Sequence, residues 1–191
     1  MNDTTRHPAE PCAASLPHNQ PIFLVGMMGA GKTTIGRSLA KVLGREFVDL
    51  DQAIEARCGV PVSHIFEVEG EAGFRKRETL LLDEYSKQAG IVLATGGGAV
   101  LAPENRRMLA ERGVVVYLRA TADELYRRVA KDRNRPLLQT ANPRERVSQL
   151  LAQRAPLYEE VAHVAFDTGS LPIGQAAQAL VQQLQSTPAL S

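Results

Sequence analysis

The stretch Gly26-Met27-Met28-Gly29-Ala30-Gly31-Lys32-Thr33 decides how the rest of the chain is interpreted. It matches G-x-x-x-x-G-K-[ST], the phosphate-binding loop (P-loop) that joins a buried strand to the first turn of a helix. Residues 21–25 before it are a continuous apolar run typical of a buried strand. Residues 32–43 have helical periodicity and are followed by Gly44, a common helix end. This context predicts a loop whose backbone N–H groups bind phosphate.

Each part of the P-loop has an expected chemical role. Its glycines allow a tight turn that points N–H groups inward, and the helix that follows adds the positive end of its dipole. Lys32 would reach the β- and γ-phosphates of ATP, and the hydroxyl of Thr33 would complete the shell of a magnesium ion. The alternative is a glycine-rich turn that binds no phosphate. The complete motif in the required context favours nucleotide binding.

The rest of the chain alternates short apolar runs with amphipathic stretches. Strands are expected at residues 21–25, 46–49, 91–94, 114–118 and 163–166, and helices at 32–43, 52–57, 62–68, 71–87, 104–111, 122–131, 143–160 and 173–185. This alternation, with apolar strands, predicts an α/β fold with a parallel sheet covered on both faces. We expect a single domain over residues 21–185, between tails at 1–20 and 186–191.

Length and charge limit the possible classes of protein. A chain of 191 residues has room for one well-cored domain, and 44% apolar with 23% charged residues are ordinary globular values. Its 22 basic and 21 acidic residues leave a net charge of +1, so we expect no nucleic-acid and no membrane partner. Only two cysteines and no long apolar run favour a soluble protein of the reducing cytoplasm.

Acidic residues and glycines follow two of the expected strands, at the edge where open α/β sheets bind ligands. Asp49 and Asp51 are two apart, so in an extended segment both carboxylates would project to one side. One would hold magnesium through water and the other would orient a substrate hydroxyl, unless Asp51 only caps the next helix. Gly96-Gly97-Gly98 would let a ligand approach the backbone, unless it is a plain flexible turn.

Four arginines are candidates for binding an anion, because a planar guanidinium suits carboxylates and phosphates. They are Arg75, Arg77, Arg135 and Arg154. Arg135 lies in the stretch 132–142, whose weak periodicity predicts a mobile surface loop. Each arginine taken alone is more simply a solvated surface residue. Periodicity does not choose among them.

The chain resembles the shikimate kinase family over about residues 21–185. The matching blocks are GMMGAGKTT (26–34), DLD (49–51), GFRKRE (73–78), LATGGG (93–98), RPLL (135–138) and RAPLY (154–158). The resemblance implies ATP- and Mg²⁺-dependent phosphorylation of the 3-hydroxyl of shikimate, a step of chorismate and aromatic amino acid biosynthesis, by a cytoplasmic monomer. It also implies a three-layer P-loop fold of the nucleoside-monophosphate-kinase type, with sheet order 2-3-1-4-5 and a mobile lid at about 132–142.

The resemblance implies roles for individual residues. Asp51 would be the base or orienting group, with Lys32 and Arg135 as the other catalytic residues, Arg135 within the lid. Two arginines would clamp the carboxylate of shikimate, and Glu78 would hold one of them, Arg75. The implied ATP contacts are Gly29, Ala30, Gly31, Lys32, Thr33, Thr34, Arg128 and Arg135; the substrate contacts are Asp51, Arg75, Gly96, Gly97, Gly98 and Arg154; the metal residues are Thr33 and Asp49. Phe66 and Phe74 would wall the substrate pocket, unless they are ordinary core residues.

Three other functions compete with this one. A related kinase of gluconate or of a nucleotide would share the P-loop and lid, but would not be expected to combine the blocks at 73–78, 93–98 and 154–158. A ligand-sensing module on the same fold could lose Asp51 or Arg135. A GTPase switch would carry an Asn-Lys-x-Asp signature, which this sequence lacks.

Overall fold

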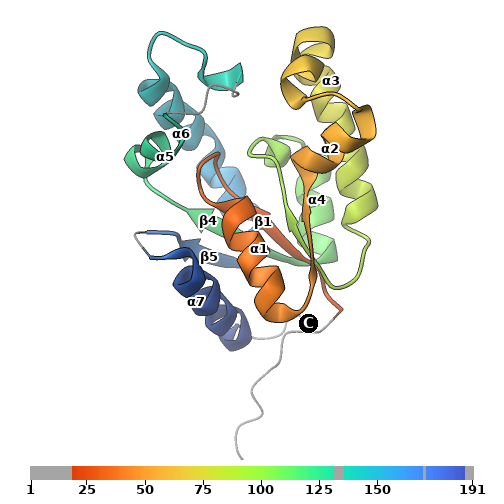
Figure 1. The fold of residues 1–191 in the computed structure, drawn as a ribbon, viewed down its shortest axis with the longest axis vertical. Helices are drawn as coiled ribbons and strands as arrows, with labels where there is room; N and C mark the ends of the chain where they lie inside the picture. Colours follow the sequence, from red (N-terminus) through yellow and green to blue (C-terminus); the bar gives the residue numbers. More distant parts are fainter. Residues whose placement is uncertain (1–18, 131–135, 170, 188–191) are drawn as a thin grey trace, which may run out of the picture.

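The computed structural model describes residues 19–130, 136–169 and 171–187. Five strands form one parallel sheet in the order β2-β3-β1-β4-β5 (Figure 1). Their bounds are β1 Ile22–Val25, β2 Glu46–Asp49, β3 Ile91–Ala94, β4 Val114–Arg119 and β5 Val164–Asp167. The α/β class expected from the sequence pattern and the strand order 2-3-1-4-5 implied by the family resemblance are therefore confirmed.

Helices cover both faces of the sheet and complete the three layers. On one face α1 packs against β3 and α7, and on the other α4 and α6 pack against β4 and against each other (Figure 1). The helix bounds are α1 Lys32–Leu43, α2 Leu50–Cys58, α3 Val62–Tyr85, α4 Pro103–Arg112, α5 Ala122–Val129, α6 Pro143–Val161 and α7 Ile173–Ser186, with 3₁₀ turns η1 Ala99–Leu101 and η2 Pro136–Leu138. Among these helices of the described residues, none is both long and apolar enough to cross a membrane.

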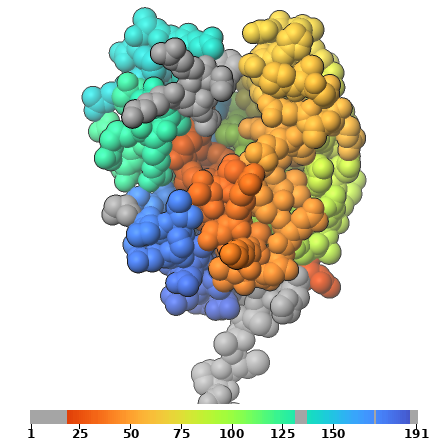
Figure 2. Space-filling model, in the orientation of Figure 1, coloured from red at the N-terminus to blue at the C-terminus, as the bar shows by residue number. Residues whose placement is uncertain are grey.

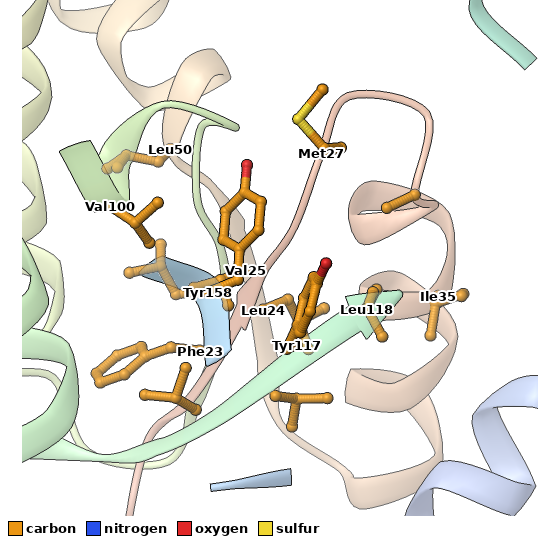
Figure 3. Packing of buried hydrophobic residues seen from close by; sticks show 14 of the residues in the cluster. Phe23, Leu24, Val25, Met27, Ile35, Leu50, Val100, Tyr117, Leu118 and Tyr158 are labelled. Atoms are coloured by element: carbon orange, nitrogen blue, oxygen red, sulfur yellow. The ribbon is translucent and has the colours of Figure 1, made fainter. Parts of the chain in front are cut away.

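The central strands are apolar along their whole length because both of their faces are buried. Every residue of β1 and β3 is buried, and so are the first five residues of β4. Figure 3 shows Leu24, Tyr117 and Leu118 of adjacent strands within this core, with Tyr158 of α6 nearby. Continuous apolar strands are the pattern expected of a parallel sheet between two helix layers. The core thus fixes the carboxyl ends of the strands, where the P-loop begins.

Helix α3 is two helical segments joined by a kink at Gly70. This residue has φ 68° and ψ −179°, a conformation that glycine adopts far more readily than other residues. The kink agrees with the two helices expected at 62–68 and 71–87, although the second ends at Tyr85. Across it, Arg77 donates from Nη2 to Oε1 of Glu69 at 2.5 Å. The kink sets the direction in which the second segment presents its arginines.

One pair of helices lies on each side of the P-loop, beyond the carboxyl ends of the strands. α2 and α3 lie on one side, and α5 and α6 lie on the other (Figure 1). Figure 2 shows that the surface is hollowed between these two sides. Residues 131–135 lie outside the described residues, and they include all three charged residues of the expected lid, Asp132, Arg133 and Arg135. The described remainder of the lid contains η2.

Candidate active site

The P-loop has the backbone that its sequence predicts. Gly26 has φ 140°, and a Cβ there would lie 2.6 Å from the backbone oxygen of Leu118 in the neighbouring strand, so a side chain is excluded. The N–H of Ala30 donates to the carbonyl of Met27 at 3.1 Å, which closes the turn. Helix α1 begins directly after it at Lys32. The N-terminus of the helix therefore adjoins the loop, as phosphate binding requires.

The side chains of Lys32 and Thr33 lie on the two sides of this loop. The Lys32 ammonium donates to the carbonyls of Gly26 and Met27 at 2.8 and 2.9 Å, so its positive charge stays close to the turn. The Thr33 hydroxyl donates to Oδ2 of Asp49 at 2.7 Å. This hydrogen bond joins the P-loop to the end of β2. Together the loop and these two side chains form what we call the phosphate side of the site.

The acidic pair has a different local geometry from the one expected. Asp49 is the N-cap of α2, and its Oδ1 accepts from the N–H groups of Asp51 and Gln52 at 3.1 and 3.3 Å. The expectation that an extended segment carries both carboxylates was wrong, because α2 starts at Leu50 and not at Gln52. The alternative that Asp51 caps the helix was also wrong, since Asp51 lies within the first helical turn. Even so, both carboxylates line one cleft.

Charged residues from α3 and α6 form a second part of the site. Together with Asp51 and the glycine triplet 96–98, we call them the acceptor side. Arg75 donates from Nη1 to Oε2 of Glu78 at 2.7 Å and from Nη2 to Oε1 of Glu71 at 2.9 Å. The contact expected between Arg75 and Glu78 is therefore present. Arg154 is almost fully buried, with 2% of its surface exposed. A buried arginine needs a charged or polar partner, which a ligand carboxylate can supply.

Glu78 is a fully buried carboxyl in the middle of these charges. Burial raises the pKa of Glu78 to about 6; the positive charges of Arg75 and Arg154 oppose that rise, and the negative charge of Asp51 adds to it. Its Oε1 atom has no hydrogen-bond partner within the described part of the chain. Glu78 thus ionises near neutral pH, and its ionised form holds Arg75.

The glycine triplet is required by close approach of these side chains. A Cβ at Gly96 would lie 2.2 Å from Oε1 of Glu78, and a Cβ at Gly98 would lie 2.2 Å from Nη2 of Arg75. The carbonyl of Gly97 accepts from Nη1 of Arg154 at 3.3 Å and also from the hydroxyl of Tyr158. The triplet is therefore the surface against which the ion pair of the acceptor side packs, and not a plain flexible turn.

The expected aromatic residues of the substrate pocket also belong to the core. The rings of Phe66 and Phe74 lie 4.8 Å apart between their centroids, on either side of the kink in α3. Phe74 is buried, and Phe66 packs partly buried against the same cluster. The guanidinium of Arg75 lies 5.2 Å from the centroid of the Phe74 ring. Phe74 therefore supports the arginine of the acceptor side from below while it packs in the core.

One cleft of about 340 Å³ connects the phosphate side with the acceptor side. It is lined by Met28, Gly29, Gly31, Lys32, Thr33, Thr34, Asp49, Asp51, Thr95, Gly97 and Arg128. Nine of these were expected from the sequence, all except Met28 and Thr95. Thr95 was not; its buried hydroxyl donates to the carbonyl of Leu24, so it holds β3 beside β1 under the cleft. Arg75 and Arg154 do not line this cleft. They pack against the glycine triplet, and Gly97 of that triplet lines the cleft.

A second pocket of about 250 Å³ adjoins the P-loop on the side of α7. It is lined by Gly29, Ala30, Gly31, Thr34, Ile35, Arg128, Thr168, Leu171, Ile173 and Ala176. Arg128 donates to the carbonyls of Gly29 and Gly169 and to the hydroxyl of Thr168, at 3.2, 2.8 and 3.1 Å. Sequence reasoning missed Thr168 and Leu171, because the connection between β5 and α7 has no periodic pattern that could identify them.

The fold and this site define a P-loop kinase of a small acceptor molecule. The family model "Shikimate kinase" matches residues 28–185. A shikimate kinase from Bordetella avium is 63% identical over 173 residues, which are 91% of this chain and 83% of that protein. The shikimate kinase of Ralstonia nicotianae is 56% identical over 164 residues, 86% of each chain. A solved structure of the shikimate kinase from Acinetobacter baumannii in complex with shikimate has a TM-score of 0.87 at 47% identity, and covers 90% of this chain and 96% of that one. The chain belongs to the shikimate kinase family.

Proposed function

We propose that this enzyme, an ATP-dependent kinase of shikimate by its family, uses Asp51 to orient the 3-hydroxyl of shikimate and to take its proton. The observation that carries this role is the shared cleft: Asp51 and Lys32 line the same cavity, which also reaches Gly97. Phosphoryl transfer depends on positioning and charge stabilisation more than on covalent chemistry. A carboxylate at the acceptor end and a cation at the phosphate end are the two groups that such a transfer needs.

Residues of the phosphate side would bind the triphosphate of ATP. Backbone N–H groups of Gly29 and Gly31, with those of Thr33 and Thr34 at the start of α1, would surround the phosphates, and Ala30, whose N–H closes the turn, would complete the loop around them. Lys32 already lies against the loop and would move to the γ-phosphate, where it stabilises the charge of the transferring group. Arg135, outside the described residues, would supply a second cation when the lid closes and water is excluded.

Residues of the acceptor side would bind shikimate. Arg75 and Arg154 would clamp its carboxylate, and Gly96, Gly97 and Gly98 would let the ring approach the backbone closely. Two buried polar atoms support a ligand here, because Nε of Arg154 has no hydrogen-bond partner among the described residues, and neither does Oε1 of Glu78. Such atoms are costly to bury and are usually satisfied by a ligand or water.

The oxygens of Thr33 and Asp49 fit a magnesium ion. Magnesium prefers hard oxygen ligands and is commonly held by one carboxylate with substrate phosphates, and these two groups meet 2.7 Å apart at the cleft. Only Oδ2 of Asp49 faces Thr33, since Oδ1 is committed to capping α2. As the family resemblance implies, Asp49 would hold the ion indirectly, through water. The ion, when bound, neutralises charge on the phosphate oxygens.

We also propose that the enzyme works as a monomer in the cytoplasm. The support for a monomer is the resemblance to the shikimate kinase family, which implies one. The small net charge of +1 and the content of two cysteines are compatible with the reducing cytoplasm. Light scattering coupled to gel filtration measures the mass directly; a mass near 20.7 kDa is expected.

A coupled assay of ADP release tests the proposed function. Purified protein with magnesium and ATP is offered shikimate, gluconate and nucleoside monophosphates separately. Release of ADP with shikimate alone is the expected result. Chelation of magnesium should abolish that release, and turnover that is fastest with gluconate or with a nucleotide would reject the substrate.

A further inference from the structure

Tyr158 shares one hydrogen-bond acceptor with Arg154. The two residues are four apart on α6, so their side chains leave the same face of the helix. Both donate to the carbonyl of Gly97, Arg154 from Nη1 at 3.3 Å and Tyr158 from its hydroxyl. The middle residue of the glycine triplet is thus held from α6 by two donors at once.

The triplet needs such an attachment because of its composition. Three consecutive glycines have more backbone freedom than any other tripeptide, and ordering them costs correspondingly more entropy. Hydrogen bonds fix the two ends: the N–H of Ala99 donates to the carbonyl of Gly96, and that of Leu101 donates to the carbonyl of Gly98. The carbonyl of Gly97 lies between these anchors. Because a peptide unit is planar, fixing this carbonyl also fixes the direction of the N–H of Gly98.

The position of Tyr158 keeps its hydroxyl directed at this carbonyl. The residue is fully buried, and its ring stacks on that of Tyr117 with centroids 5.0 Å apart. Figure 3 shows both rings with their hydroxyls pointing toward the end of the sheet where Met27 of the P-loop lies. Burial raises the pKa of the Tyr158 hydroxyl further above its ordinary value, so the group stays protonated and remains a donor.

We propose that Tyr158 is a positioning residue for the acceptor: its hydroxyl fixes the Gly97 peptide and, through the shared carbonyl, the guanidinium of Arg154. Gly98 packs against Arg75 directly after this peptide, so the same hydroxyl influences where both arginines of the acceptor side stand. The inference rests on the proposed role of the acceptor side in binding shikimate. It assigns no contact between Tyr158 and substrate.

The alternative is that Tyr158 only fills the core. If Tyr158 only filled the core, its substitution would alter the thermal stability of the protein and would weaken the binding of ATP and of shikimate to the same extent. A positioning role would act on shikimate selectively, since the phosphate side is built from the P-loop and makes none of these hydrogen bonds. The ratio of the two effects therefore separates the two roles.

The test is Tyr158→Phe, which keeps the ring and its stacking and removes only the hydroxyl. We expect KM for shikimate to rise roughly tenfold, the size expected when one buried donor is lost, while KM for ATP changes by less than about twofold. Tyr117→Phe is the matched control, because it removes a hydroxyl from the same stacked pair without touching Gly97. Its KM for shikimate should stay at the wild-type value.

Equilibrium binding extends the test to a variant with slow turnover. Calorimetric titration of Tyr158→Phe with shikimate should show the same loss of affinity, and titration with ADP should not. Unchanged shikimate affinity, equal losses for both ligands, or an equal effect of Tyr117→Phe would each overturn the proposal. Wild-type protein that fails to phosphorylate shikimate would instead reject the proposed function, so the two failures are distinguishable.

Discussion

The phosphate side and the acceptor side of the cleft are built in different ways. The phosphate side comes from eight consecutive residues, and the binding groups that we propose for it are mainly backbone N–H groups whose direction is set by the glycines of the loop. The acceptor side brings together side chains from α2, α3 and α6 with the turn after β3, and its charges hold one another in place. The proposed site for the phosphates of ATP is therefore built from one local segment of the chain. A site for the particular substrate depends on long-range packing.

This difference predicts that changes on the acceptor side lower affinity or turnover with shikimate while ATP still binds. The largest expected effect is that of Asp51→Asn, which preserves the size of the side chain and removes its ability to take a proton. The turnover number should fall by at least about 10²-fold, the usual size of general-base effects. Stopped assays of shikimate 3-phosphate measure turnover, and nucleotide titration measures binding. Turnover near that of the wild type would show that Asp51 has no such role.

Arg154→Lys should have the next largest effect. Lysine keeps the positive charge but loses the planar fork, so it can no longer bond to Gly97 and to a carboxylate together. We expect KM for shikimate to rise roughly 30-fold, as for loss of a charge-assisted hydrogen bond, with KM for ATP nearly unchanged. Arg144→Lys, at an exposed position on the same helix, is the control. An unchanged KM for shikimate would contradict the carboxylate clamp.

The pH dependence of shikimate binding should depend on Glu78. Its pKa is about 6, so as pH falls through that value the carboxylate gains a proton and holds Arg75 less firmly. The value of kcat/KM for shikimate should therefore decrease below about pH 6. The stability of the fold depends on pH in the opposite direction to shikimate binding. Because folding raises the pKa of Glu78, its protonation contributes to the free energy of unfolding at low pH, and this contribution is lost as pH rises through about 6.

Glu78→Gln separates this group from the others that titrate nearby. At pH 7.5 its KM for shikimate should be roughly tenfold higher, because the hydrogen bond to Arg75 is no longer assisted by charge. The decrease of kcat/KM around pH 6 should disappear. Persistence of that decrease in the variant would assign it to another group.

A smaller effect is expected from Gly98→Ala. The added Cβ would meet the guanidinium of Arg75, the far end of a flexible side chain that can move aside. We expect a rise of roughly threefold in KM for shikimate, well below the cost of losing a charged partner. Gly174→Ala is the matched control, because a Cβ at that helical position meets only open space. Equal effects of the two variants would show that the triplet does not position Arg75.

The sequence predicted the phosphate side better than the acceptor side, for a physical reason. The P-loop, the strand before it and the helix ended by Gly44 depend on local backbone preferences, and the structure has them where they were expected. The predicted geometry of Asp51 was wrong, because nothing in the residues alone showed that α2 begins immediately after β2.

Long-range contacts were the part that periodicity could not supply. Arg75 and Arg154 are 79 positions apart and come together around Glu78 and the glycine triplet. Their choice over Arg77 came from the family resemblance alone. Arg77 instead pairs with Glu69 across the kink at Gly70. Tyr158 closes the block RAPLY that carried part of that resemblance, yet its bond to Gly97 depends on how α6 packs against η1, the turn that follows the glycine triplet. That placement is a property of the folded core.

A competition experiment tests the central claim most directly. Wild-type enzyme receives a limiting amount of ATP with magnesium and an equal mixture of shikimate, gluconate and a nucleoside monophosphate, and phosphorus NMR identifies the product. The account predicts that the transferred phosphate is found on the 3-hydroxyl of shikimate. Phosphate on another acceptor, on a different hydroxyl of shikimate, or released to water would contradict it.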